Sequence, residues 1–248
     1  MNRRHVVSLF CIFAIADAAP AQEDAKAVIE RAITAHGGAD KLDKYLAGRV
    51  QSKGAIAAQG GQVPFVSVVV YQLPDKVKNT VEFTLQGGAR PVTQILNGDK
   101  VGVVINGIAQ QVLPAQADEM KQAAHARNLR RLTPLLKGDK YKLAMAGEKQ
   151  IAGKTAVGVK VTAEGAREVR LYFDKATDLL LAQERHSFDA AGKPTEQQEI
   201  FSDYREAEGL KYPAHTAVMQ NGERYIVSEV VSIKLLQKID SREFTIPQ

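Results

Sequence analysis

Short runs in which apolar and polar residues alternate recur along most of this chain. Val81, Phe83 and Leu85 alternate with polar residues, and the same pattern returns in residues 157–161 and 225–233. A period of two places every second side chain on one face of a β-strand. Asn-Gly pairs, which favour tight hairpin turns because both residues tolerate a positive φ, stand at residues 97–98, 106–107 and 221–222. The pattern predicts antiparallel hairpins.

Two segments replace this alternation with helical spacing. Residues 24–46 begin with apolar residues on one helical face and contain Gly37-Gly38, which ends the first helix before a second short turn. Residues 115–137 follow Pro114 and carry a looser apolar stripe. Strands are expected on either side of this second helical segment, over residues 48–113 and 140–236.

These elements predict an α+β fold that is mostly antiparallel β. A sheet of about 11 to 13 strands must curl, split or close, because strands twist. Two helical segments cannot cover both faces of so large a sheet. We therefore expect a curved sheet or half-barrel in which the N-terminal helix and the central helical insertion, a helical lid, cover the concave face. No linker-like composition divides the two meanders, so residues 22–248 are expected to form a single domain.

Residues 1–21 have the pattern of a cleaved signal peptide. Arg3 and Arg4 precede a short apolar run, and two A-x-A sites end at Ala18 and Ala21. The run is shorter than the roughly 20 apolar residues that span a bilayer. The sequence does not distinguish between the two cleavage sites, but either one predicts export to the periplasm.

The single cysteine, Cys11, falls within this segment. Phe10 precedes it, whereas a lipidation site requires a small residue there, so no lipid anchor is expected. Removing Arg3, Arg4 and Asp17 lowers the formal net charge from +5 to +4. Because the protein is exported and its positive charge is small, we expect no nucleic-acid partner. The positive charge predicts only a weak attraction to anionic membrane surfaces.

The remaining histidines are His36, His125, His186 and His215, and none pairs with another at the spacing of a zinc site on a helix. Nucleophile-elbow and phosphate-loop motifs are also missing from the sequence. We expect no catalytic residue, no bound metal and no cofactor. His36 is predicted to cap the first helix at its C-terminus. The weakest alternative is a hydrolase without a recognisable motif.

Two stretches carry a resemblance to a known group. Residues 171–180, LYFDKATDLL, form a strand, turn and strand, and residues 201–213 continue the pattern. With the element order over most of the chain, they resemble the LolA/LolB-like periplasmic lipoprotein-carrier superfamily. Ala35-His36-Gly37-Gly38 looks like the first helix end in uncharacterised secreted members. The resemblance implies a hydrophobic cavity between sheet and helices, which the family uses to hold acyl chains of lipoproteins or other lipids.

Candidate site residues follow from this resemblance. Apolar side chains of one strand and of the helical insertion are candidates for the cavity wall: Val81, Phe83, Leu85, Met120, Leu129, Leu132 and Leu136. Basic side chains of the insertion are candidates for contact with anionic headgroups or an acidic partner: His125, Arg127, Arg130 and Arg131. Arginines three to four residues apart share a helix surface, so a solvated helix face is the alternative interpretation.

The leading prediction is a non-catalytic, monomeric periplasmic protein that holds a lipid, an acyl chain or another hydrophobic ligand, with lipoprotein transport as one use. The alternative is a cell-envelope sensor or scaffold that binds protein partners through exposed sheet edges and carries no lipid. The two predictions differ in whether the cavity contains a cargo.

Overall fold

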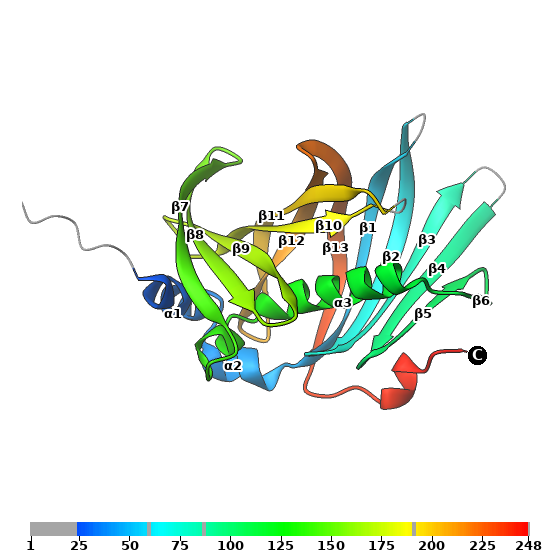
Figure 1. Ribbon diagram of the computed structural model, residues 1–248, viewed down its shortest axis with the longest axis horizontal. Helices are drawn as coiled ribbons and strands as arrows, with labels where there is room; N and C mark the ends of the chain where they lie inside the picture. The colour runs from blue at the N-terminus through cyan, green and yellow to red at the C-terminus, as the bar shows by residue number, and fades with distance from the viewer. Residues whose placement is uncertain (1–23, 59–60, 86–87, 190–191, 248) are drawn as a thin grey trace, which may run out of the picture.

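The computed structural model describes residues 24–58, 61–85, 88–189 and 192–247. Within these ranges the chain forms a 13-stranded antiparallel sheet, with helices on its concave side (Figure 1). This confirms the predicted α+β class, the curved open sheet and the upper end of the expected strand number. The predicted signal peptide, residues 1–21, and Cys11 within it lie outside the described residues.

Two meanders build the sheet. The first contains β1 (Ala47–Ala58), β2 (Gly61–Gln72), β3 (Lys76–Leu85), β4 (Gly88–Asn97), β5 (Lys100–Ile105) and β6 (Ile108–Gln110). The second contains β7 (Lys142–Ile151), β8 (Lys154–Ala163), β9 (Ala166–Asp174), β10 (Leu180–Phe188), β11 (Pro194–Ala207), β12 (Leu210–Gln220) and β13 (Glu223–Leu236). Each strand pairs with the next one in its meander, and β1 pairs with β13. The β1–β13 pairing therefore joins the first and last strands into one sheet.

The helical segments lie before the first meander and between the two meanders. The N-terminal segment contains α1 (Ala25–Ala35) and α2 (Ala39–Lys44), separated at Gly37 and Gly38, whose φ angles are 114° and 91°. The central insertion contains α3 (Pro114–Leu129) and the 3₁₀ helix η1 (Thr133–Leu136). A second 3₁₀ helix, η2 (Ser241–Phe244), follows β13. Figure 1 shows α3 running along the concave side, from the β5–β6 edge towards α2.

The main hydrophobic core fills the concave side of the second meander. The apolar stripe of α1, including Val28 and Ile29, packs with Leu129 at the end of α3 and with inward side chains of β8 and β9 such as Val159 and Leu171. All five are essentially inaccessible to solvent. Since α1 and the end of α3 occupy this side, the concave surface around β1, β2 and β13 is left as the unfilled part of the fold.

Two glycines on β1 shape this unfilled part. Gly48 pairs with Tyr71 and Gly54 pairs with Phe65 on β2. A Cβ atom at Gly48 would lie 2.6 Å from the Tyr71 hydroxyl, and one at Gly54 would lie 2.7 Å from Phe65 Cζ. The aromatic side chains thus occupy the space that a side chain on β1 would need. The missing Cβ atoms keep both rings close to the sheet.

Replacing Gly54 tests this packing. In Gly54→Ala the new methyl group would lie 2.2 Å from the Val227 carbonyl oxygen, so backbone as well as the Phe65 ring must move. We expect the free energy of unfolding to fall by about 3 kcal/mol in urea denaturation followed by circular dichroism. Lys53→Ala, at the neighbouring and mostly exposed position, is the control and should change it by less than about 0.5 kcal/mol. Equal effects of the two substitutions would contradict the packing argument.

Candidate ligand cavity

A partly open cavity of about 490 Å³ lies between the concave face of the sheet and the helices. Small-molecule sites in proteins measure roughly 300 to 1,000 Å³, so its volume suits a ligand of that class. Side chains from both meanders and from α2 and α3 line it. Its apolar wall includes Val50, Ile56, Phe65, Val69, Phe201 and Val230. The cavity therefore spans the β1–β13 junction.

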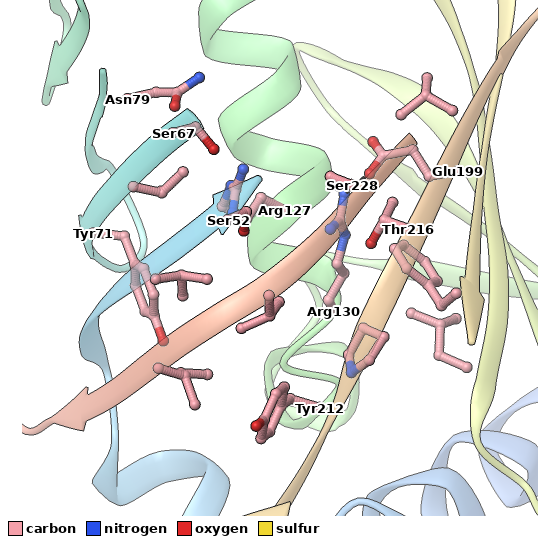
Figure 2. A pocket seen from close by; sticks show the side chains of 18 of the residues that line it. Ser52, Ser67, Tyr71, Asn79, Arg127, Arg130, Glu199, Tyr212, Thr216 and Ser228 are labelled. Carbon is pink, nitrogen blue, oxygen red and sulfur yellow. Dashed lines mark hydrogen bonds and ion pairs between the residues drawn. The ribbon is translucent and has the colours of Figure 1, made fainter. Parts of the chain in front are cut away.

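A row of polar side chains crosses the sheet side of this cavity. On five neighbouring strands it contains Asn79, Ser67, Ser52, Ser228 and Thr216 (Figure 2). Ser52 is opposite Ser67 in the β1–β2 register, and Thr216 is opposite Ser228 in the β12–β13 register. Glu199 on β11 continues the row, and Gln183 is its register partner on β10. This row, named here the polar row, lies under α3.

Arg130 fastens the end of α3 to this row. Its Nη2 donates to Glu199 Oε2 at 2.5 Å and its Nε to Gln183 Oε1 at 2.8 Å. The guanidinium also lies 4.8 Å from the centre of the Phe201 ring, in a cation–π contact. Gln183 in turn donates to the Ala126 carbonyl at 2.7 Å. The charge of Arg130 is thus compensated by groups of the sheet.

Glu199 is held in its ionised form by the surrounding arginines. Burial alone would raise the pKa of the Glu199 carboxyl, but the charges of Arg130, Arg127 and Arg185 together outweigh burial and hold this pKa below its usual range. The carboxylate is one negative charge close to several positive ones. It therefore anchors the cationic side of α3 to the sheet.

Arg127 lies one helical turn before Arg130 and also lines the cavity. Within the described ranges, no hydrogen bond or ion pair connects its guanidinium to another residue. Burial, followed by the nearby charge of Arg130, lowers the pKa of Arg127, but a guanidinium remains protonated in proteins. Figure 2 shows Arg127 and Arg130 both reaching from α3 towards the strands. Arg127 is a charged group facing a mainly apolar space.

Arg131, the third arginine of the cluster, also lines the cavity but is paired. Its Nη2 donates to Asp43 Oδ1 at 3.1 Å, and Asp43 also accepts from Thr133 at 2.7 Å and from Lys137 at 2.6 Å. Burial would raise the pKa of Asp43, but these partners hold it below its usual range. Asp43 thereby connects α2 to the joint between α3 and η1, a structural role.

His125 lies away from the cavity lining. Its half-buried ring stands 5.9 Å from the ring centre of Tyr141, and burial together with Lys140 lowers its pKa. Of the four candidate headgroup contacts, the structure thus brings the three arginines to the cavity and leaves His125 outside it. Arg130 and Arg131 have carboxylate partners there, and Arg127 has none among the described residues.

Of the apolar candidates from the first meander and the start of the insertion, two line the cavity and two lie outside it. Val81 and Phe83 belong to the cavity wall. Leu85 ends β3 with 37% of its surface exposed, and Met120 is partly exposed on α3; neither reaches the cavity. The cavity wall thus includes Val81 and Phe83 of β3 but not Leu85 at the end of that strand.

The leucines at the end of the insertion lie in the core instead. Leu129 and Leu132 are fully buried with α1, and Leu136 packs beside them. The part of α3 that faces the cavity is basic rather than apolar. Sequence reasoning missed the polar row, although a signal for it exists: Ser52 stands at an inward position between Val50 and Ile56.

His36 caps α1 as predicted, and both of its ring nitrogens have partners. Nδ1 lies 2.7 Å from the Ala32 carbonyl, and the Leu180 N–H donates to Nε2 at 3.4 Å. These partners fit a neutral ring, and burial lowers the pKa of His36. His186 and His215 lie on exposed surface beside carboxylates, at 2.7 Å from Glu196 and 3.4 Å from Asp203.

Within the described ranges, no group of three or more His, Cys, Asp or Glu side chains gathers as metal ligands could. None of the helices in the same ranges is long and apolar enough to cross a membrane.

No known family model and no curated protein sequence matches this chain. Several solved structures, in contrast, match this chain in their fold. A LolA superfamily protein from Nitrosomonas europaea superimposes with a TM-score of 0.55 at 13% identity, covering 90% of this chain and 98% of the other. The chain has the LolA-like fold. A DUF1329 family protein from Desulfovibrio piger gives 0.54 at 12% identity, covering 90% and 98% of the two chains. A putative outer membrane lipoprotein-sorting protein domain from Vibrio parahaemolyticus gives 0.51 at 12%, covering 89% and 97%.

This likeness confirms the resemblance at the level of the fold. The LolA-like architecture accounts for the concave sheet, its helical cover and the cavity between them. At such low identity it assigns no ligand, so the chemistry of the cavity has to be argued from the residues of this chain.

The ionic anchor of α3 yields a prediction about pH. Glu199→Gln should lower the free energy of unfolding at pH 7 by about 3 kcal/mol, because it leaves Arg130 without its carboxylate partner in a mostly buried place. The folded-state pKa of Glu199 is lowered, so its contribution is complete above the ordinary value of 4.5 and is lost as the pH falls below it. The difference from the unmodified protein should therefore shrink in acid.

Urea denaturation between pH 7 and pH 3 measures this difference. Glu196→Gln on the same strand is the control, since 67% of that side chain is exposed, and it should change stability by less than about 0.5 kcal/mol. A Glu199→Gln effect that does not change with pH would contradict the assignment of Glu199 as the ionised anchor.

Proposed function

We propose that this protein is a non-catalytic periplasmic binding protein that holds a lipid, an acyl chain or another amphiphilic molecule in the cavity between its curved sheet and α3. The observation that carries the proposal is the cavity itself. Apolar side chains of both meanders wall it, and it is left free because the main core fills only the part of the concave side over the second meander. Apolar ligands gain free energy by leaving water for such a surface.

The comparisons support the same function. The Vibrio parahaemolyticus structure is named as a lipoprotein-sorting domain, and it covers almost the whole of this chain. The signal-peptide pattern of residues 1–21 supports a place in the periplasm. We propose that the protein acts there as a monomer, with lipoprotein transport as one use of the cavity.

The side chains around the cavity support binding rather than catalysis. Glu199 and Asp43 are held as ionised partners of arginines, and His36 uses both ring nitrogens within the fold. A general base needs a free acceptor within reach of a substrate proton. These three groups are engaged in structural contacts.

A pair of tryptophan substitutions on β13 tests the cavity. Val230 lines it, whereas Val231 is 56% exposed outside the lining. Val230→Trp should weaken binding of the neutral fluorescent probe 1-N-phenylnaphthylamine by about tenfold or more, because the indole occupies the ligand's volume. Val231→Trp should leave probe affinity unchanged. The chain has no other tryptophan, so the indole emission of each variant reports its burial. Equal probe affinity in both variants would contradict a ligand site in this cavity.

Native mass spectrometry of the protein extracted gently from its own periplasm tests the cargo. We expect a bound lipid or acyl compound that is lost in Val230→Trp. A ligand-free spectrum for the unmodified protein would favour the sensor or scaffold alternative.

A further inference from the structure

The arginines of α3 differ in what compensates them. Arg130 is paired with Glu199 on β11, and Arg131 with Asp43 on α2. Arg127 has neither an ion pair nor a hydrogen bond within the part of the chain that the structure describes. A charge that is partly shielded from water is stabilised when a partner of opposite charge is supplied. The cavity face of α3 therefore presents one uncompensated positive charge.

The serine and threonine hydroxyls of the polar row opposite Arg127 have no partner among the described residues either. For Ser52, Ser67, Thr216 and Ser228, no side-chain hydrogen bond occurs within the described ranges. In the same ranges, Asn79 Oδ1 is a buried atom without a hydrogen-bond partner. Ser67 is buried and Ser52, Thr216 and Ser228 are half-buried in the cavity lining, so a polar group bound there would supply hydrogen bonds that the fold does not.

The row lies midway along the apolar wall rather than at its rim. On β1 the inward position Ser52 stands between Val50 and Ile56, and on β13 Ser228 stands between Ile226 and Val230. A ligand whose polar group meets the row therefore has apolar wall on either side for its tail. The polar group would lie inside the protein and not at the surface.

The charge balance indicates the sign of that group. Beside the polar row, Arg127 and Arg130 contribute two positive charges and Glu199 one negative charge, so one positive charge remains there, and Lys211 elsewhere in the lining adds another. A guanidinium and several hydroxyls are all donors suited to a carboxylate or a phosphodiester oxygen. A neutral ligand would leave Arg127 unpaired, and a cationic one would be repelled by it.

We propose that Arg127 and the polar row form an internal headgroup site for an amphiphile with a single anionic group, a carboxylate or a phosphodiester, whose tail lies against the apolar wall. The inference rests on the proposed function and specifies the chemical class of its ligand. Arg127 donates to the anion, and the hydroxyls of Ser52 and Ser228 complete the contact from the sheet side.

Four amphiphiles with the same 12-carbon chain test the inference: dodecanoate, dodecanoyl lysophosphatidylglycerol, dodecanol and dodecyltrimethylammonium. Each competes with 1-N-phenylnaphthylamine for the full-length protein below its micelle concentration. At least one of the two anionic compounds should bind about tenfold or more tightly than dodecanol, as expected for a charge-assisted hydrogen bond, and the cation should bind most weakly. The two anionic arms distinguish a carboxylate from a phosphodiester. Acetate should not displace the probe, because it lacks a tail.

Arg127→Gln should remove the preference: affinity for the anionic compound falls about tenfold or more, and affinity for dodecanol is maintained. Retained dodecanol binding also shows that the variant is folded. Lys121→Gln is the matched control, since it removes one positive charge from α3 at a position outside the cavity lining, and it should preserve the anion preference.

The outcomes separate this inference from the proposed function. If dodecanol binds the unmodified protein as tightly as both anions, or if Arg127→Gln keeps the preference, the headgroup site is wrong while the cavity function stands. If acetate alone displaces the probe, the site binds free anions and the inference is wrong. If no compound or probe binds, both proposals fall.

Discussion

The pairing of β1 with β13 is the contact on which the rest of this structure depends. It joins two meanders, far apart in sequence, into one continuous antiparallel sheet. Because strands twist, a sheet of this size curves, and its concave side must be filled or left as a cavity. The junction lies in the middle of the concave face, and the cavity lies over it. Without this pairing, neither the cavity wall nor the polar row would be continuous.

Polar contacts position α3 along much of its length, and only its end, with Ala126 and Leu129, packs in the apolar core. Arg130 is bound to Glu199 and Gln183, and Glu119 on the preceding turns accepts from Arg167 at 2.5 Å and Arg185 at 2.6 Å. An apolar helix face would pack directly on the strands, as α1 does in the core, and would fill the concave side. Long charged side chains reach the sheet while leaving space between helix and strands. The ionic contacts thus both fix the helix and maintain the cavity.

The strands were predictable because alternation and Asn-Gly turns are local signals, as at Val81 and Phe83 and at Asn106-Gly107. The helix ends were predictable for the same reason, from Gly37-Gly38 and Pro114. The site was less predictable, because the partners of Arg130 and Arg131 lie 69 and 88 residues away. Sequence spacing places the arginines on one surface, but only the folded chain decides that Glu199 and Asp43 neutralise two of them. The same holds for Leu129 and Leu132, whose burial depends on where α1 docks.

The unpartnered groups connect the stability of the fold with its ligand. One carboxylate, Glu199, stands beside both Arg127 and Arg130 and is paired with Arg130, so the positive charge at Arg127 is only partly balanced. A bound anion would supply the missing partner, and binding to the folded state alone stabilises that state. An anionic amphiphile gains from both the apolar wall and the charge, whereas a neutral one gains only from the wall. The proposed charge selection in this cavity therefore follows from the excess of positive charge at Arg127.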